Sequence, residues 1–197
     1  MHGKTLLARN ILIGLLALGL SGCAAVVVGG AAATAKVAHD RRTTVDFLKD
    51  QEIYLKALSV YNNDELLTQQ THIDISVYNK QVLLIGHAHN MEIVESFSQR
   101  VAIIPGVRTV FNEVAVGAAP TLPGGTSDAY LTARVKVELF NVKIPNFDPT
   151  RVKVSTSQGS VYLMGLLTPT EAHAVTNRVR FVSGVKRVVK LFEYLDE

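Results

Sequence analysis

The sequence is poor in cysteine and lacks tryptophan, since Cys23 is the single cysteine among 197 residues. A lone cysteine excludes an intramolecular disulfide, so the fold must be stabilised by apolar packing. A membrane-spanning run is also missing from the N-terminal part. The apolar run at residues 11–20 covers about half of a ~30 Å hydrocarbon core at ~1.5 Å per residue, which is too short for a span.

Motifs for catalysis and metal binding are equally scarce. No Gly-rich phosphate loop, Ser nucleophile elbow or paired-carboxylate site can be placed in the sequence. His87 and His89 stand two apart at the end of a predicted strand, but no third ligand lies near them, so two loop histidines without a role are expected. We therefore expect no enzyme activity, no metal and no cofactor.

The N-terminus carries the features of an export signal. Lys4 and Arg9 precede the apolar run at residues 11–20, and the small pair Ser21-Gly22 closes it, which predicts a signal peptide at residues 1–22. Leu20-Ser21-Gly22-Cys23 resembles the lipobox of bacterial lipoproteins. The alternative is a plain signal peptide with a coincidental cysteine.

The lipobox resemblance implies a specific modification and location. Cys23 would be the first mature residue and would carry a diacylglycerol and an N-acyl chain such as palmitate. Two or three acyl chains anchor a protein essentially permanently. Ala24 stands where an inner-membrane retention signal would commonly be Asp, which implies the outer membrane, facing the periplasm. Such a location excludes nucleic acid as a partner.

The mature chain repeats itself after a tether at residues 23–42, which we interpret as a spacer. Residues 72–77 and 151–156 show the same apolar alternation at an offset of 79, which also pairs Gly86 with Gly165. The Gly- and Pro-rich residues 118–126 form a linker. We therefore predict two modules, at residues 43–117 and 127–197, each small enough that the two copies could pack on each other.

Each module is predicted to contain one helix, two strands, a second helix and a last strand. The first helices are expected at residues 47–62 and 128–141, and the hairpin strands at residues 71–78 with 81–86 and at residues 151–156 with 160–165. The second helices should begin at Asn90 and Pro169 and stop at Gly106 and Gly184. The fold class is α/β (α+β), with two tandem α-β-β-α-β sandwich modules, each a three-stranded sheet covered by two helices.

The strand and turn sequences then carry a family resemblance. Residues 161–166, Glu171-Ala172 and residues 182–188 resemble the core of a BON domain, as do residues 82–86 with Pro105-Gly106-Val107. Ile104-Pro105-Gly106 departs from the more usual Val-x-Gly turn of the family. A lipobox followed by two BON domains is similar to the dual-BON outer-membrane lipoproteins associated with division sites and envelope integrity. The resemblance implies phospholipid binding through the first helix of the second domain.

The periodicity of that helix is compatible with such a surface. One face, with Leu131, Val135 and Leu139, would contact the sheet. The opposite face is also apolar, and basic residues flank it, as expected for a helix that rests on anionic lipid. The candidate lipid-binding residues are Tyr130, Ala133, Arg134, Lys136, Val137 and Phe140. Periodicity alone equally allows this face to pack on the first module or on the linker.

The distribution of charge agrees with the resemblance. Residues 43–117 contain five Lys and Arg against nine Asp and Glu, whereas residues 127–197 contain ten against seven. Only the second module suits an anionic surface, although its basic residues could instead meet the acidic first module. We expect a lipoprotein that binds anionic phospholipid and supports envelope integrity. The alternative function is a periplasmic adaptor for envelope assembly or division proteins.

Overall fold

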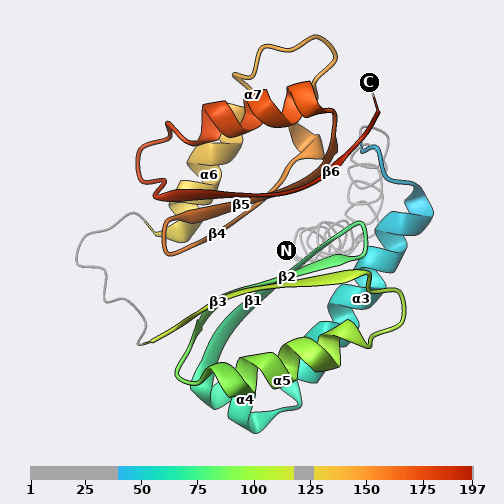
Figure 1. Cartoon of the computed structure of the whole chain (residues 1–197), viewed down its shortest axis with the longest axis vertical. Helices are drawn as coiled ribbons and strands as arrows, with labels where there is room; N and C mark the ends of the chain where they lie inside the picture. Colours follow the sequence, from blue (N-terminus) through green and yellow to red (C-terminus); the bar gives the residue numbers. More distant parts are fainter. Residues whose placement is uncertain (1–39, 118–126, 197) are drawn as a thin grey trace, which may run out of the picture. The chain divides into compact units, whose positions relative to one another are not determined.

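Two modules with the same order of strands make up the computed structural model, which describes residues 40–117 and 127–196 (Figure 1). The first module contains α3 (Thr44–Asn62), α4 (Glu65–Gln70), β1 (Thr71–Tyr78), β2 (Gln81–Ala88), α5 (Met91–Ala102) and β3 (Thr109–Val116). The second contains α6 (Asp128–Leu139), the 3-10 turn η1 (Pro149–Arg151), β4 (Lys153–Ser157), β5 (Ser160–Leu167), α7 (Pro169–Val179) and β6 (Arg187–Tyr194). The predicted fold class is confirmed.

Each module has a three-stranded sheet whose central strand is the second one in sequence, β2 or β5. The first two strands pair antiparallel and the third pairs parallel to the central strand. Two-residue loops close both hairpins, with φ of 47° and 65° at Asn79 and Lys80 and of 53° and 81° at Gln158 and Gly159. Two successive positive φ values are typical of a type I′ turn, whose twist matches the flanking strands.

α7 begins at Pro169 as predicted, and α5 begins at Met91, one residue after the predicted start; both helices end earlier than predicted. Thr168 caps α7 and forms a capping box with Glu171, and Asn90 caps α5. The helices end at Ala102 and Val179, so the expectation that Gly106 and Gly184 terminate them is wrong. Both glycines instead have φ of +98° in the turn before the last strand, a conformation that glycine adopts without steric cost.

One helix of the first module escaped prediction. Asp64 caps α4 by accepting a hydrogen bond from the Leu67 amide at 3.1 Å, and Leu67 is fully buried in the core. The helix has six residues, so its apolar pattern is too short for periodicity to identify. It adds a third helix to the two predicted for this module.

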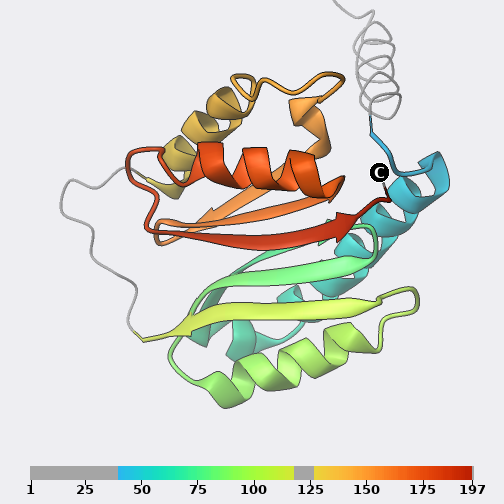
Figure 2. The same cartoon turned by 45° about the horizontal axis from the view of Figure 1, so that its top comes forward.

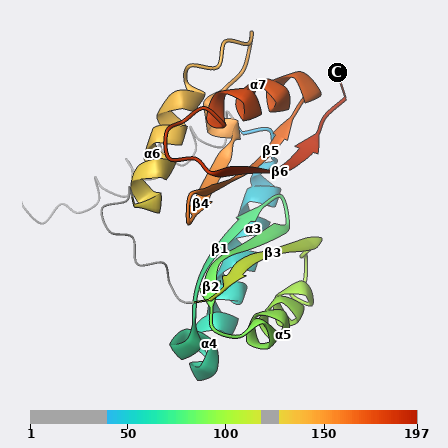
Figure 3. The same ribbon diagram turned by 60° about the vertical axis from the view of Figure 1, so that its left-hand side comes forward.

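The helices of each module cover one face of its sheet. In the second module α6 and α7 lie on the same side of β4–β6 (Figure 2), and their buried residues form one cluster with Val161, Leu163 and Leu167. In the first module α3 and α5 cover the sheet (Figure 3), packing on Val82, Leu84 and Ala88. Alternate residues of the central strands therefore point away from the helices.

The faces that point away from the helices pack on each other. Tyr78, Leu83 and Ile85 of the first module form a buried cluster with Tyr162, Met164 and Leu191 of the second. Ser76 and Ser155, which occupy equivalent positions of the repeat, lie opposite each other with 3.3 Å between their hydroxyl oxygens. Equivalent residues meet where two copies are related by approximate two-fold symmetry. The two modules therefore share a third core between their sheets.

Residues 40–42, which we expected to belong to the tether, also contact both modules. Arg41 donates to both carboxylate oxygens of Glu171 at 2.6 and 2.9 Å, and to the Leu166 carbonyl. Arg42 donates to the buried Asp50 at 2.5 Å, and its guanidinium lies 4.0 Å from the centre of the Tyr78 ring. Two neighbouring arginines thus join the start of the first module to a buried carboxylate of the second.

Candidate functional site

The first helix of the second module, α6, is held to its sheet by a regular apolar face. Ser127 caps the helix by accepting a hydrogen bond from the Tyr130 amide at 3.3 Å. Leu131, Val135 and Leu139 are the buried residues of α6. Val142 lies beyond the helix end and packs against the same core. The predicted sheet-facing stripe is therefore confirmed, although the helix ends two residues before the predicted boundary.

The opposite face of α6 is apolar and exposed. Tyr130 is 55%, Val137 63% and Phe140 67% exposed, and Ala133 between them is exposed as well. We call these four residues the outer stripe. The first module does not cover it, because the contact between the modules uses the faces of the sheets. The expected alternative, in which the outer stripe packs on the first module, is therefore wrong, and the linker lies outside the described residues.

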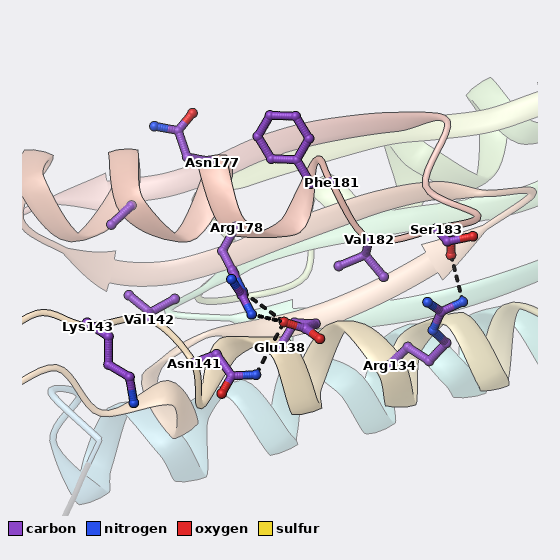
Figure 4. Close-up of a pocket in the computed structure, with 11 residues that line it drawn as sticks. Arg134, Glu138, Asn141, Val142, Lys143, Asn177, Arg178, Phe181, Val182 and Ser183 are labelled. Carbon is purple, nitrogen blue, oxygen red and sulfur yellow. Dashed lines mark hydrogen bonds and ion pairs between the residues drawn. The ribbon is translucent and has the colours of Figure 1, made fainter.

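The two basic residues predicted beside the outer stripe differ in their surroundings. Arg134 donates from Nη1 to the Ser183 carbonyl at 3.0 Å, and its guanidinium carbon lies 5.8 Å from the centre of the Tyr130 ring. Figure 4 shows this side chain reaching from α6 toward the loop after α7. Lys136 is exposed and makes no ion pair with the described residues. Arg134 is thus held in place by its contacts, whereas the Lys136 side chain extends into solvent.

Part of the basic charge of the second module does meet the acidic first module. Arg187 pairs with Glu113 at 2.8 Å, and Lys153 donates to the Val77 carbonyl at 2.9 Å. In the other direction Arg108 of the first module pairs with Glu193 at 2.5 Å. Arg134 and Lys136 take no part in this interface. The positive charge beside the outer stripe is therefore not neutralised by the first module.

An aromatic residue near α6 was missed by sequence reasoning. Phe181 follows α7 and is 76% exposed, and the guanidinium of Arg180 lies 4.6 Å from the centre of its ring. It stands in the loop between the helix and the last strand, where no apolar period applies. The sequence does contain a signal for it: Phe181 follows the two arginines Arg178 and Arg180 and stands three residues before Gly184.

The remaining sequence candidates can be placed as follows. Cys23 and the signal peptide lie outside the described residues. His87 lies in β2 and stacks on His72 with ring centres 5.6 Å apart, while His89 contacts the Gln70 carbonyl. Within the described residues, no group of three or more metal-binding side chains comes together. None of the helices that the structure describes is long and apolar enough to span a membrane.

Comparisons with known proteins agree on one family. The BON domain matches residues 49–118 and again residues 127–196. The chain is 34% identical over 180 residues to the outer membrane lipoprotein DolP of Haemophilus influenzae, covering 90% of this chain and 91% of that protein. It is also 34% identical over 149 residues to a 21 kDa hemolysin of Actinobacillus pleuropneumoniae, covering 74% and 75%.

A solved structure also matches over much of the chain. The C-terminal domain of CdsD, a structural protein of the type III secretion system of Chlamydia trachomatis, covers 75% of this chain and 67% of its own length. The TM-score is 0.29 at 11% identity, a similarity too low to inform the function of this chain.

Proposed function

The chain belongs to the BON-domain family as an outer-membrane lipoprotein with two such domains, and we propose that it binds anionic phospholipid through the outer stripe of α6. The match to the BON domain and the similarity to the outer membrane lipoprotein DolP point to a non-catalytic protein. The lipid anchor on Cys23 would hold the protein at the outer membrane, facing the periplasm, and the second module would make the additional contact. Its role would be to support envelope integrity.

The observation that carries this proposal is the exposure of three large apolar side chains, two of them aromatic, on α6 and its C-cap residue, with Arg134 and Lys136 beside them. Tyr130, Val137 and Phe140 are each more than half exposed, although α6 is already fixed by its buried face. Burial of a large apolar side chain is worth ~1.5–3 kcal/mol when it is complete, and less at a half-hydrated interface. Aromatic residues with flanking bases are typical of a helix that lies in the headgroup region.

The direct test is flotation of the mature chain, residues 23–197, made without acyl groups by Cys23→Ser. We expect it to float with phosphatidylglycerol vesicles and not with phosphatidylcholine vesicles. Phe140→Asp removes an exposed ring and adds a like charge to an anionic surface, so binding should weaken at least about tenfold, which corresponds to ~1.4 kcal/mol. An adaptor that recognises proteins alone would stay unbound with both kinds of vesicle.

The first module offers a matched control for this experiment. Leu55 lies on α3 and is 62% exposed, close to the 67% of Phe140. Leu55→Asp makes the same kind of change on the first helix of the other module and should leave flotation unchanged. Equal loss of binding in both variants would show that any added negative charge suffices, and the assignment to α6 would then be wrong.

The anchor is tested separately in cells with the full-length chain. Cys23→Ser removes the residue that would carry the lipid, so the protein should remain an uncleaved precursor or leave the outer-membrane fraction. Normal amounts of mature Cys23→Ser protein in the outer membrane would contradict acylation at this residue. Loss of the chain should also raise envelope permeability to detergent, and Phe140→Asp should restore resistance less well than the wild type.

A further inference from the structure

A cleft lined by charged and apolar side chains lies between α6 and α7, beside the outer stripe. Its volume is about 590 Å³, and Figure 4 shows Arg134 and Glu138 on the α6 side facing Arg178 on the α7 side. Figure 4 shows Ser183 toward one end of the cleft and Lys143 toward the other. Arg134 and Glu138 are four residues apart, so they lie one above the other on the same face of the helix. The cleft therefore collects three cations and one carboxylate.

The carboxylate in the cleft is already neutralised. Glu138 accepts from Nε of Arg178 at 2.8 Å and pairs with its Nη2 at 2.5 Å, and Asn141 donates to the same oxygen at 3.3 Å. The hydrogen bonds from Asn141 and Arg178 lower the pKa of Glu138, so it is charged at neutral pH and paired. Arg178 still has N–H groups that this pair does not use, because a guanidinium carries five.

The cations that remain match one phosphate. Arg134 gives one hydrogen bond to the Ser183 carbonyl and has further N–H donors, and Lys143 makes no ion pair with the described residues. The C-terminal ends of α6 and α7 lie at this cleft, and each carries about half a negative charge. These negative helix ends reduce the positive charge of Arg134 and Lys143 but do not cancel it. That charge suits a phosphodiester, which carries a single negative charge.

The surroundings of the cleft favour a lipid over a soluble ion. Tyr130 and Val137 of the outer stripe do not line the cleft, but they neighbour residues that do: the guanidinium carbon of Arg134 lies 5.8 Å from the centre of the Tyr130 ring, and Val137 precedes Glu138. Phe181 lines the cleft from the α7 side. All three are more than half exposed, with Phe181 the most exposed at 76%. A charged cleft between apolar walls on the same surface is suited to a headgroup whose acyl chains continue into a bilayer.

We propose that the α6–α7 cleft holds the phosphodiester of one membrane phospholipid, bound by Arg134 and Arg178, and that Phe181 is a second membrane contact. Lys143 attracts the lipid from the end of the cleft. This inference rests on the proposed lipid binding and extends it, because the outer stripe alone provides a surface without a binding site for the headgroup. Guanidinium groups suit this task, since they give charge-assisted hydrogen bonds to phosphate oxygens.

The experiment compares single variants of the non-acylated mature chain in binding phosphatidylglycerol vesicles. Arg134→Gln should weaken binding at least tenfold, and Phe181→Ala should weaken it several-fold. Lys190→Gln removes the same unit of charge on β6, outside the cleft, and should change binding less than threefold. Arg134→Lys keeps the charge and should recover part of the loss. Circular dichroism checks that each variant is folded.

A soluble short-chain phosphatidylglycerol, used below its micelle concentration, locates the headgroup by NMR. Amides of Asn177 and Ser183 on the α7 side should shift together with those of α6. Glycerophosphoglycerol, which has no acyl chains, should shift the same amides only at much higher concentration. If it or inorganic phosphate binds as tightly as the short-chain lipid, the cleft is a site for soluble phosphate esters and the lipid assignment is wrong.

Two further outcomes separate this inference from the proposed function. If Arg134→Gln and Lys190→Gln weaken vesicle binding equally and the shifts stay on the outer stripe, the headgroup does not enter the cleft, while lipid binding through α6 stands. If the wild-type chain binds no vesicles and no short-chain lipid, both proposals are wrong.

Discussion

The two modules share one buried plan and differ on the surface of their first helices. Asp50 in α3 accepts hydrogen bonds from the hairpin amides of Asn79 and Lys80, and Asp128 in α6 accepts them from Gln158 and Gly159. These two residues are 78 apart, and the same offset relates the buried positions of the two helices. The outer stripe of α6 corresponds to Glu52, Leu55, Ser59 and Asn62 in α3.

A second difference concerns the space beside the helix. In the first module α4 follows α3 and its cap Asp64 pairs at 2.7 Å with Arg100, the position equivalent to Arg178. In the second module the described chain between α6 and β4 holds only the short turn η1, and Arg178 instead pairs with Glu138 across the cleft. The comparison teaches that the buried plan is common to both copies. The exposed faces of the first helices differ in chemistry, since α3 exposes the aliphatic Val45, Leu48 and Leu55, whereas α6 presents aromatic residues flanked by bases.

The largest expected effect tests the shared plan. Asp50 is fully buried and bonds two amides and the guanidinium of Arg42. Asp50→Ala would leave both hairpin amides without a partner and would break the Arg42–Asp50 ion pair, while Arg42 keeps its ion pair with Asp40. We expect it to lower the free energy of unfolding by ~3–5 kcal/mol. Asp128 is half-buried and bonds two amides, so Asp128→Ala should cost about 1 kcal/mol. Urea unfolding measures both.

A similar loss for the two aspartates would mean that the buried arginine adds nothing to the first module. Arg42→Met is the matching variant, because it removes the guanidinium and leaves Asp50 with its two amides. Its cost should fall between those of the two aspartate variants.

The next effect sharpens the contrast between the outer faces. Replacing Tyr130, Val137 and Phe140 by their α3 counterparts, Glu, Ser and Asn, makes the outer stripe polar. Phosphatidylglycerol vesicle binding should fall at least a hundredfold, since three apolar contacts are lost. The melting temperature should change little, because these side chains are exposed. Vesicle flotation and calorimetry measure the two properties.

The reciprocal change gives the control. Glu52→Tyr, Ser59→Val and Asn62→Phe carry the outer stripe to α3 in the chain that has lost it. If vesicle binding returns, an apolar helix face is sufficient and the cleft beside α6 is unnecessary. If it does not return, the second module contributes more than its outer stripe.

Most of the fold could be predicted because the core alternation is strong in both copies. Residues 71–78 were predicted with their observed bounds, and the capping box of α7 is complete in the sequence. Gly86 could be recognised from the repeat alone, and the structure gives the reason. A Cβ at this position would lie 1.9 Å from the His72 carbonyl oxygen of the neighbouring strand.

The parts that could not be predicted depend on tertiary contacts. Residues 40–42 show no periodicity in the sequence. Arg41 is instead held in place by its hydrogen bonds to Glu171, which lies 130 residues away along the chain. The core between the two sheets could not be predicted, because the sequence does not show that the helix-free faces of the sheets pack on each other. The face of α6 that contacts the sheet was predicted from the sequence. Whether the opposite face packs on the first module could not be predicted, because it depends on the contact between the two sheets.

A smaller effect concerns the pH dependence of the contact between Arg41 and Glu171. Burial raises the pKa of Glu171. The hydrogen bonds from Arg41 and the Thr168 amide, together with the nearby charges of Arg41 and Arg151, lower it by more than burial raises it, so the net shift of the pKa is downward. A carboxyl with a lowered folded pKa adds stability that is present above its unfolded pKa and is lost as the pH falls through the folded value. Stability should therefore decrease from about pH 5 downward.

Arg41→Gln removes one source of this shift and should flatten the decrease between pH 5 and pH 3, measured by urea unfolding at each pH. Lys190→Gln removes an exposed base of β6 that makes no ion pair with the described residues, and it is the control. An unchanged pH profile in Arg41→Gln would show that Thr168 and Arg151 hold Glu171 without the arginine of residue 41.

The smallest expected effect is at the edge of the contact between the modules. Arg187 pairs with Glu113 at 2.8 Å, with its side chain 55% exposed and that of Glu113 29% exposed. Exposed ion pairs are screened by solvent and cost side-chain entropy, so their coupling energy is typically ~0.2–1 kcal/mol. The coupling energy from a double-mutant cycle of Arg187→Gln and Glu113→Gln, measured by urea unfolding, should fall in this range and should shrink in 0.5 M salt.

Arg187 also donates to the Tyr162 hydroxyl at 3.0 Å. The cycle removes that separate contribution, because it is lost in both backgrounds that carry Arg187→Gln. A coupling well above 1 kcal/mol would mean that this pair, and not the apolar cluster between the sheets, holds the two modules together.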